Sequence, residues 1–293
     1  MRNRFINDLT KAAKVNKNIA LVVGDLGYGV VEEFAESFPD RFFNAGVAEQ
    51  NMMGLSAGLA SEGLHVFTYS IANFPLFRCA EHIRNDVDYH NLPVTIVSVG
   101  GGLSYGNLGY SHHAIQDFAL VRSFPNMLIA SPGDPMEVSS CLDFLLKNPQ
   151  PSYLRLGKSG EECFHASPPE INPGAWLSVR TNESATKTIL TTGAAMSVGM
   201  KRLKMNVNTF NLYTMPLWGM KYKNLQPQQI IEHEEIYIIE DHLQDGGFGS
   251  WMAESIEKDK NLFKKFTFEY LNDKVCGAVG SQEALNKFGG LIP

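Results

Sequence analysis

The stretch FNAGVAEQNMMG, residues 43–54, places a single carboxylate, Glu49, among small and apolar residues where a strand-like run gives way to a helical one. Removing a carboxylate from water costs several kcal/mol unless it is paired, so Glu49 either faces solvent or takes part in chemistry. A Glu in a first helical turn can also simply favour the positive end of the helix dipole, by roughly 0.3–1 kcal/mol. The small residues that follow, as far as Ala60, let another backbone approach closely and predict a helix buried on several sides.

The composition indicates a globular chain of about two domains, with 293 residues, 44% of them hydrophobic and 19% charged. A net charge of −6 and the lack of a Lys/Arg-dense run give no reason to expect a nucleic acid or a membrane as partner. The basic start has no apolar segment typical of a secretory signal. The four cysteines form no Cys-x-x-Cys pair, which favours a reducing cytoplasmic location.

Apolar runs rich in β-branched residues alternate with helical patterns along the first half of the chain, at residues 19–23, 65–69, 94–99, 127–130 and 153–156. The intervals leave room for crossover helices, which indicates a largely parallel sheet covered on both faces. A second set of strands is predicted at 188–191, 207–213, 236–239 and 266–270. The pattern predicts an α/β protein of two doubly wound domains, residues 1–160 and 186–293, joined by a Pro-rich linker at 161–185.

The motif Gly-Val-Ala-Glu-Gln-Asn-Met at 46–52, followed by Gly58-Leu59-Ala60, resembles the thiamine-diphosphate enzymes of the transketolase and deoxyxylulose-phosphate synthase type. The glycine-rich turn at 246–250 resembles the C-terminal domain of the same family. The resemblance implies a thiamine-diphosphate pyrimidine-binding domain, then a transketolase-type C-terminal domain. It also implies that Glu49 bonds the pyrimidine ring, because a carboxyl on that ring nitrogen favours the tautomer whose amine can act as a base.

Aromatic residues of the segment 69–78 correspond to those that stack on the pyrimidine in the family. Phe74 is the first choice for this contact and Phe77 the second. The charged residues that follow are predicted to form the solvated side of a helix: Arg78, Glu81, His82 and Arg84.

His112 aligns with a family histidine near the substrate carbonyl, where an imidazole can bond a developing negative charge or move a proton. His113 occupies a position usually filled by Gln. Among the phosphate ligands of sugar-phosphate transketolases, Arg155 is the one plausible match, so it is predicted to bind substrate. With fewer cations than the family pattern, the site could accept an unphosphorylated or nucleotide-linked sugar instead.

The family motif that binds the diphosphate, Gly-Asp-Gly with a downstream Asn, has no match: Gly24-Asp25-Leu26 and Asp245-Gly246-Gly247 both depart from it. The resemblance therefore implies a separate N-terminal transketolase subunit that holds the diphosphate and its Mg²⁺ or Ca²⁺, with no metal on this chain. The small-residue helix after Glu49 is predicted to pack on its own symmetry mate, giving a self-dimer within an α2β2 assembly.

The predicted activity is the transfer of a two-carbon ketol unit from a ketose to an aldose. The β subunits of 2-oxoacid dehydrogenases and deoxyxylulose-phosphate synthase, which decarboxylate their substrates, share the same plan and stay open as alternatives. A non-catalytic regulatory subunit is another. The run Gly102-Leu103-Ser104-Tyr105-Gly106 also matches the nucleophile elbow of serine hydrolases, although a helix should follow Ser104 directly and residues 107–110 start one poorly.

Overall fold

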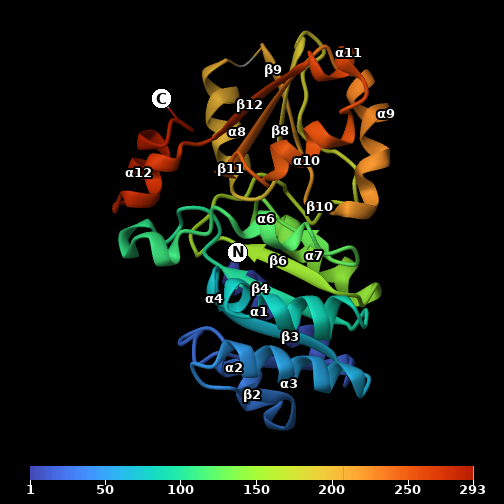
Figure 1. Ribbon diagram of the computed structural model, residues 1–293, viewed down its shortest axis with the longest axis vertical. Helices are drawn as coiled ribbons and strands as arrows, with labels where there is room; N and C mark the ends of the chain where they lie inside the picture. The colour runs from blue at the N-terminus through green and yellow to red at the C-terminus, as the bar shows by residue number, and fades with distance from the viewer. Residues whose placement is uncertain (207, 293) are drawn as a thin grey trace.

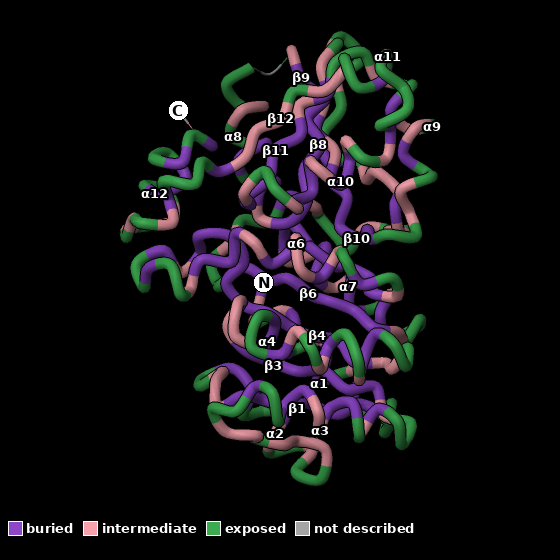
Figure 2. The backbone as a smooth tube through the Cα atoms, viewed as in Figure 1, coloured by how far each residue is buried: buried purple, intermediate pink, exposed green. Residues whose placement is uncertain are grey.

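A computed structural model describes residues 1–206 and 208–292, and its two sheets lie one above the other (Figure 1). Both are largely parallel with helices on both faces, as the alternation of apolar runs and helical patterns predicts. Figure 2 shows that the central strands are mostly buried, while exposed residues lie on the outer helices and loops. The residue predicted to open the strand at 207–213, Val207, lies outside the described residues, and that strand runs over Phe210–Thr214.

The first sheet has seven strands, all parallel except at one edge. In spatial order they are β10 (Leu217–Trp218), β5 (Leu128–Ala130), β6 (Ser152–Leu156), β4 (Val94–Val99), β3 (His65–Ile71), β1 (Ile19–Val23) and β2 (Phe42–Asn44). Neighbouring residues of β1 point to opposite faces, so Leu21 joins the core beneath α1 (Arg2–Val15) and α7 (Pro135–Lys147) while Val22 joins the core beneath α3 (Glu49–Ser61).

The second sheet has five strands, in the order β12 (Phe266–Leu271), β11 (Glu235–Leu243), β8 (Lys187–Thr191), β9 (Phe210–Thr214) and β7 (Leu177–Arg180). The segment predicted as a linker, 161–185, thus contains a strand, and β7 pairs with β9 in the antiparallel sense. The sequence pattern does not predict β7, because its four residues, LSVR, form too short a run to show a period of hydrophobic residues.

One core joins the two sheets. Trp218 of β10 comes from the second half of the chain, yet this strand pairs with β5 of the first sheet. Its ring lies 5.0 Å from Phe118, 5.3 Å from Phe248 and 5.4 Å from Trp251, measured between ring centroids. The contact holds the second sheet against the carboxyl-end edge of the first.

The remaining helices complete the layers. The α-helices are α2 (Glu32–Ser37), α4 (Phe74–Phe77), α5 (Ala80–His82), α6 (Asp117–Val121), α8 (Ala195–Met205), α9 (Gln226–Ile231), α10 (Phe248–Ser255), α11 (Lys260–Phe263) and α12 (Gln282–Phe288). A π-helical segment, η2, spans Ile83–Asp88. Short 3-10 helices are η1 (Pro39–Arg41), η3 (Gly106–Leu108), η4 (Tyr110–His112), η5 (Met220–Leu225) and η6 (Asp273–Gly277). Across the described residues, no helix has the length and apolar character needed to cross a membrane.

Candidate active site

The predicted site residues follow different strands of the first sheet. Glu49 comes after β2, Phe74 after β3, and His112 in the loop after β4. Since the carboxyl ends of parallel strands meet at one edge, segments far apart in the sequence converge there, and ligands of open α/β sheets bind at this edge.

Glu49 is the first residue of α3 and is only 4% exposed. Gly46, with φ of 73°, turns the chain into the helix, and Ala48 at the N-cap offers no side-chain acceptor. Both carboxylate oxygens accept hydrogen bonds of 2.9 Å from Nη1 of Arg78. The carboxylate is therefore buried and paired.

The sequence predicts that Arg78 lies on the solvated side of a helix, but its side chain also contacts two of the predicted site residues. Half of its side chain is exposed, but its guanidinium carbon lies 4.4 Å from the centroid of the Phe74 ring while Nη1 bonds Glu49. Pro75 fits the first turn of α4, which presents Phe74 at this point. The sequence held no signal for the Glu49–Arg78 pair, because the two residues lie on separate elements, 29 positions apart.

A buried hydroxyl without a partner lies beside Glu49. Ser70 of β3 is fully buried, and its Oγ has no hydrogen-bond partner among the described residues. A methyl group placed on Gly24 would lie 3.5 Å from Sδ of Met52, 3.7 Å from this oxygen and 3.8 Å from Cγ of Glu49, so all three side chains border Gly24. Buried polar groups are normally satisfied, so the orphan hydroxyl suits a polar ring entering next to Glu49.

His112 stands edge-on to Phe74, with 5.2 Å between the ring centroids. Burial, and to a lesser degree the neighbouring His113, lowers its pKa, so the imidazole is neutral near pH 7. Nδ1 is 3.0 Å from the Ser111 hydroxyl. His113 is 1% exposed, and burial lowers its pKa as well. A neutral imidazole at position 112 can both accept and donate a proton next to Phe74.

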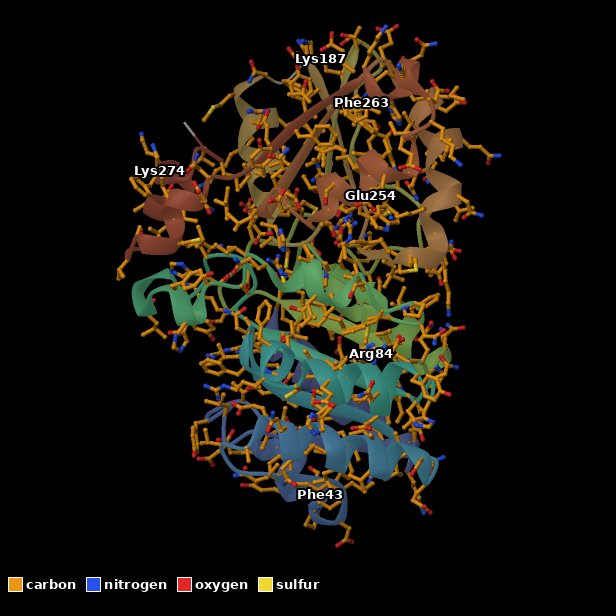
Figure 3. All side chains as sticks on the ribbon, in the orientation of Figure 1. Phe43, Arg84, Lys187, Glu254, Phe263 and Lys274 are labelled. Atoms are coloured by element: carbon orange, nitrogen blue, oxygen red, sulfur yellow. The ribbon has the colours of Figure 1, made fainter. Side chains whose placement is uncertain are left out.

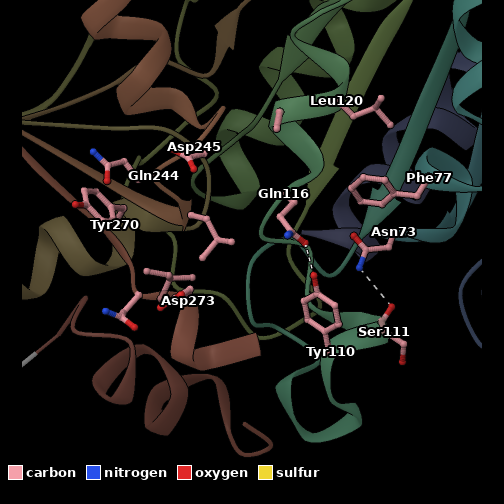
Figure 4. A pocket seen from close by; sticks show the side chains of 14 residues that line it. Asn73, Phe77, Tyr110, Ser111, Gln116, Leu120, Gln244, Asp245, Tyr270 and Asp273 are labelled. Atoms are coloured by element: carbon pink, nitrogen blue, oxygen red, sulfur yellow. Dashed lines mark hydrogen bonds between the residues drawn. The ribbon is translucent and has the colours of Figure 1, made fainter. Parts of the chain in front are cut away.

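Phe77 points in another direction, toward a cleft of about 1000 Å³ between the two sheets (Figure 4). The near wall of the cleft carries Asn73, Phe77 and Tyr110, and the far wall, from the second sheet, carries Asp245 and Asp273. Its lining, as far as the chain is described, contains two carboxylates and no Lys, Arg or His. The cleft borders the chain neighbours of Phe74 and His112, Asn73 and Ser111, and extends to the second sheet.

Arg155, predicted to bind a substrate phosphate, is 2% exposed and engaged inside the protein. Nε donates to Asp117 and Nη1 to Asp241, each at 2.7 Å, and Nη2 donates to the carbonyl of Ala114 at 2.7 Å. Burial alone would lower the pKa of Arg155, but Asp117 and Asp241 raise it above its ordinary value. Because Asp241 belongs to β11, Arg155 of β6 links the two sheets, and this position leaves it no open face for a phosphate.

Ser104 is not arranged as a nucleophile elbow. Its Oγ donates to the carbonyl of Gly101 at 2.7 Å, and the side chain is 3% exposed. The residues Gly106–Leu108 that follow form the short 3-10 helix η3 and not the longer α-helix that a nucleophile elbow requires. The hydrolase alternative therefore lacks the strand–serine–helix geometry that it needs.

The donor groups of the chain suit the pyrimidine end of the predicted cofactor better than its diphosphate end. Arg78 connects the carboxylate to the phenyl ring, and the orphan hydroxyl and the carboxylate side chain both border Gly24. By contrast, the described residues contain no group of three or more His, Cys, Asp or Glu that could hold a metal ion.

Comparison with known proteins identifies the first domain. Residues 1–160 match the family model of the transketolase pyrimidine-binding domain. A protein of Methanocaldococcus jannaschii described as a transketolase C-terminal section is 32% identical over 99% of this chain and 92% of its own length. The solved structure titled "Split gene transketolase, inactive beta4 tetramer" superposes with a TM-score of 0.83 at 28% identity, covering 99% of this chain and 93% of that one.

A longer relative, the 1-deoxy-D-xylulose-5-phosphate synthase of Clostridium perfringens, is 28% identical over 98% of this chain, which spans only 46% of that protein. The fold, the matched domain and the full-length similarity to a transketolase section agree with one another. The chain belongs to the transketolase family.

Proposed function

We propose that this chain is the pyrimidine-binding subunit of a thiamine-diphosphate-dependent transketolase that moves a two-carbon ketol unit from a ketose to an aldose. When bound, the cofactor would supply the nucleophilic carbon that the side chains of the protein lack. The observation that carries the proposal is the buried carboxylate of Glu49 at the carboxyl-end edge of the first sheet. Arg78 connects it to the Phe74 ring, and the unpartnered hydroxyl of Ser70 lies next to Gly24, as Glu49 does.

Three side chains have roles in this proposal. Glu49 would hold the proton that a pyrimidine ring nitrogen accepts, and so would set the basicity of the amine on that ring. Phe74 would supply an apolar face for the ring. His112, neutral and edge-on to Phe74, donates a hydrogen bond or a proton to the substrate oxygen. Phe77, the second choice for the stacking contact, forms part of the cleft wall instead.

The substrate class follows from the charges near the site. Arg155 is committed to Asp117 and Asp241, and the cleft beyond Phe77 presents Asp245 and Asp273. Ionised carboxylates accept hydrogen bonds from hydroxyl groups, but their negative charge repels phosphate. The proposal therefore favours a sugar whose part farthest from the reacting carbon bears free hydroxyls. Strict dependence of turnover on a terminal phosphate ester would count against this choice.

A partner subunit of the N-terminal transketolase type would hold the diphosphate and its Mg²⁺ or Ca²⁺. In the split-gene structure the β chain alone is described as an inactive tetramer, so we expect this chain alone to be inactive. All four cysteines are free, which suits the cytoplasmic location proposed for the assembly.

Self-association through α3 completes the proposed α2β2 assembly. Methyl groups placed on Gly54 and Gly58 would meet nothing within 4 Å in the described part of the chain. Each mid-helix glycine costs about 1 kcal/mol relative to alanine, so two on an open helix face suit the close approach of a second helix. Gly58→Leu should leave the isolated chain folded but abolish the dimer in light scattering; dimers of unchanged affinity would place the interface elsewhere.

The proposal is tested by assembling the chain with its diphosphate-binding partner, thiamine diphosphate and Mg²⁺, and following ketol transfer from a ketose to an aldehyde. Glu49→Gln keeps the size of the side chain and should lower turnover by about 10²-fold or more. Glu81→Gln, an exposed site on α5, is the matched control and should leave turnover unchanged. Near-normal turnover of Glu49→Gln would remove Glu49 from the mechanism.

Decarboxylation is the second candidate, because the chain also resembles a 1-deoxy-D-xylulose-5-phosphate synthase over 98% of its length. Adding pyruvate to the assembled enzyme separates the two. Release of CO₂ with formation of a new ketose would favour the synthase reaction, and ketol transfer without CO₂ release would favour the transketolase reaction.

A further inference from the structure

One guanidinium holds both side chains that the proposed function assigns to the pyrimidine. Nη1 of Arg78 donates to both oxygens of Glu49 at 2.9 Å, and the guanidinium carbon lies 4.4 Å from the centre of the Phe74 ring. Arg78 therefore occupies the carboxylate and one face of the aromatic ring at the same time.

The Arg78 contacts compete with pyrimidine binding, both for the Glu49 carboxyl group and for the face of the Phe74 ring. A guanidinium has only donors, so both Glu49 oxygens act as acceptors toward it. A pyrimidine ring nitrogen is itself an acceptor, so Glu49 must donate a proton to it. A protonated carboxyl group is a weaker acceptor for Arg78 than an ionised carboxylate, and a ring lying on Phe74 needs the face that the guanidinium covers.

The burial of the two partners shows which of them can move. The Glu49 side chain is 4% exposed and starts a helix of 13 residues, whereas half of the Arg78 side chain is exposed, next to the short helix α4. The guanidinium can rehydrate as it leaves, so the contact can be broken at modest cost.

We propose that Arg78 is a removable clamp, which closes the pyrimidine site in the free chain and must leave both Glu49 and Phe74 when the cofactor binds. This inference rests on the proposed function. It makes Arg78 a positioning residue that sets cofactor affinity, and it gives the isolated subunit a closed site.

The test measures the dissociation constant of thiamine diphosphate by calorimetry on the assembled enzyme at fixed Mg²⁺. Arg78→Met removes the clamp and keeps the apolar length of the side chain. Arg84→Met is the matched control: it removes the same charge from an exposed position six residues away, where the recorded side-chain contact is with Asn85 (Arg84 is labelled in Figure 3). Arg78→Lys keeps the charge but loses the planar stack on Phe74.

Arg78→Met should bind the cofactor about threefold to thirtyfold more tightly than wild type, Arg78→Lys should fall between them, and Arg84→Met should match wild type. The cofactor should also raise the melting temperature of Arg78→Met by more than that of wild type, a readout independent of turnover. Equal or weaker binding by Arg78→Met would overturn the clamp. Absence of binding in wild type and every variant would instead overturn the proposed function, and the clamp with it.

Discussion

In two regions of this molecule an arginine bonds a carboxylate and lies over a phenyl ring, but one arginine is half exposed and the other is buried. At the carboxyl-end edge of the first sheet, Arg78 bonds Glu49 and lies 4.4 Å from the centre of the Phe74 ring. Between the sheets, Arg155 bonds Asp117 and Asp241 and lies 4.4 Å from the centre of the Phe118 ring. The side chain of Arg78 is 50% exposed and that of Arg155 is 2% exposed.

Burial and the number of partners decide what each arrangement can do. Arg155 has two carboxylates and a backbone carbonyl, so every nitrogen of its guanidinium is bonded within the protein. Arg78 has one carboxylate and an open side. A buried, fully bonded arginine is costly to disturb and fixes the relation of the two sheets, whereas a half-exposed one can give way to a ligand.

The largest effect is expected when the buried arginine is removed. Arg155→Met leaves Asp117 and Asp241 buried without a counter-charge, which should lower the free energy of unfolding by about 3–5 kcal/mol. Urea denaturation of the isolated chain measures this loss. The triple variant that adds Asp117→Asn and Asp241→Asn should recover part of it, and a loss below about 1 kcal/mol in the single variant would show that the buried pairs do not hold the sheets together.

The two phenylalanines should separate stability from binding. Phe118 is fully buried, and Phe118→Ala should cost about 3–5 kcal/mol of unfolding free energy by opening a cavity. Phe74→Ala should cost much less stability but weaken thiamine diphosphate binding by about tenfold in calorimetry. Unchanged cofactor affinity of Phe74→Ala would transfer the stacking role to another ring, with Phe77 the next choice.

Removing the exposed arginine should have a small effect on the free chain. Arg78→Met is expected to lower the unfolding free energy by about 1 kcal/mol, because it removes the partner of the buried Glu49 but gives up a contact that is half in water. The same denaturation experiment serves for both arginines. A loss as large as that of Arg155→Met would mean that Arg78 is structural and does not act as a clamp.

Salt should give the smallest effect and distinguish the two sites without further mutation. Raising the ionic strength from about 0.1 to about 1 M shortens the screening length from about 10 to about 3 Å, which weakens exposed charge pairs more than buried ones. The stability difference between wild type and Arg78→Met should shrink in high salt, while that for Arg155→Met should stay nearly constant. Equal salt sensitivity would remove the contrast in burial as the explanation.

Most of the fold could be predicted from local patterns. Five parallel strands of the first sheet coincide with β-branched runs such as 19–23 and 94–99, because strands buried on both faces consist largely of apolar residues. The short strands β7 and β10 could not be predicted. In particular, Leu217–Trp218 becomes a strand only because the folded second half lies against β5 of the first sheet, which is a tertiary effect without a local signal.

The candidate site was predicted only in part. The strand ends that bring Glu49, Phe74 and His112 to one edge follow from the predicted parallel sheet. The hydrogen-bond partners of Arg78 and Arg155 do not follow from the predicted sheet. Arg78 resembled an ordinary charged residue of a helix surface, and Arg155 resembled a phosphate ligand, because nothing local in the sequence shows that Asp241, 86 residues away, accepts its hydrogen bond.

The central claim is that Glu49 meets the pyrimidine of thiamine diphosphate once Arg78 has moved away. The most direct measurement is a crystal structure of this chain assembled with its diphosphate-binding partner and the cofactor. We predict a hydrogen bond between the Glu49 carboxyl and a pyrimidine ring nitrogen, the ring against Phe74, and the Arg78 guanidinium released from both. A cofactor bound elsewhere, or bound while the Glu49–Arg78 pair stays intact, would contradict the account.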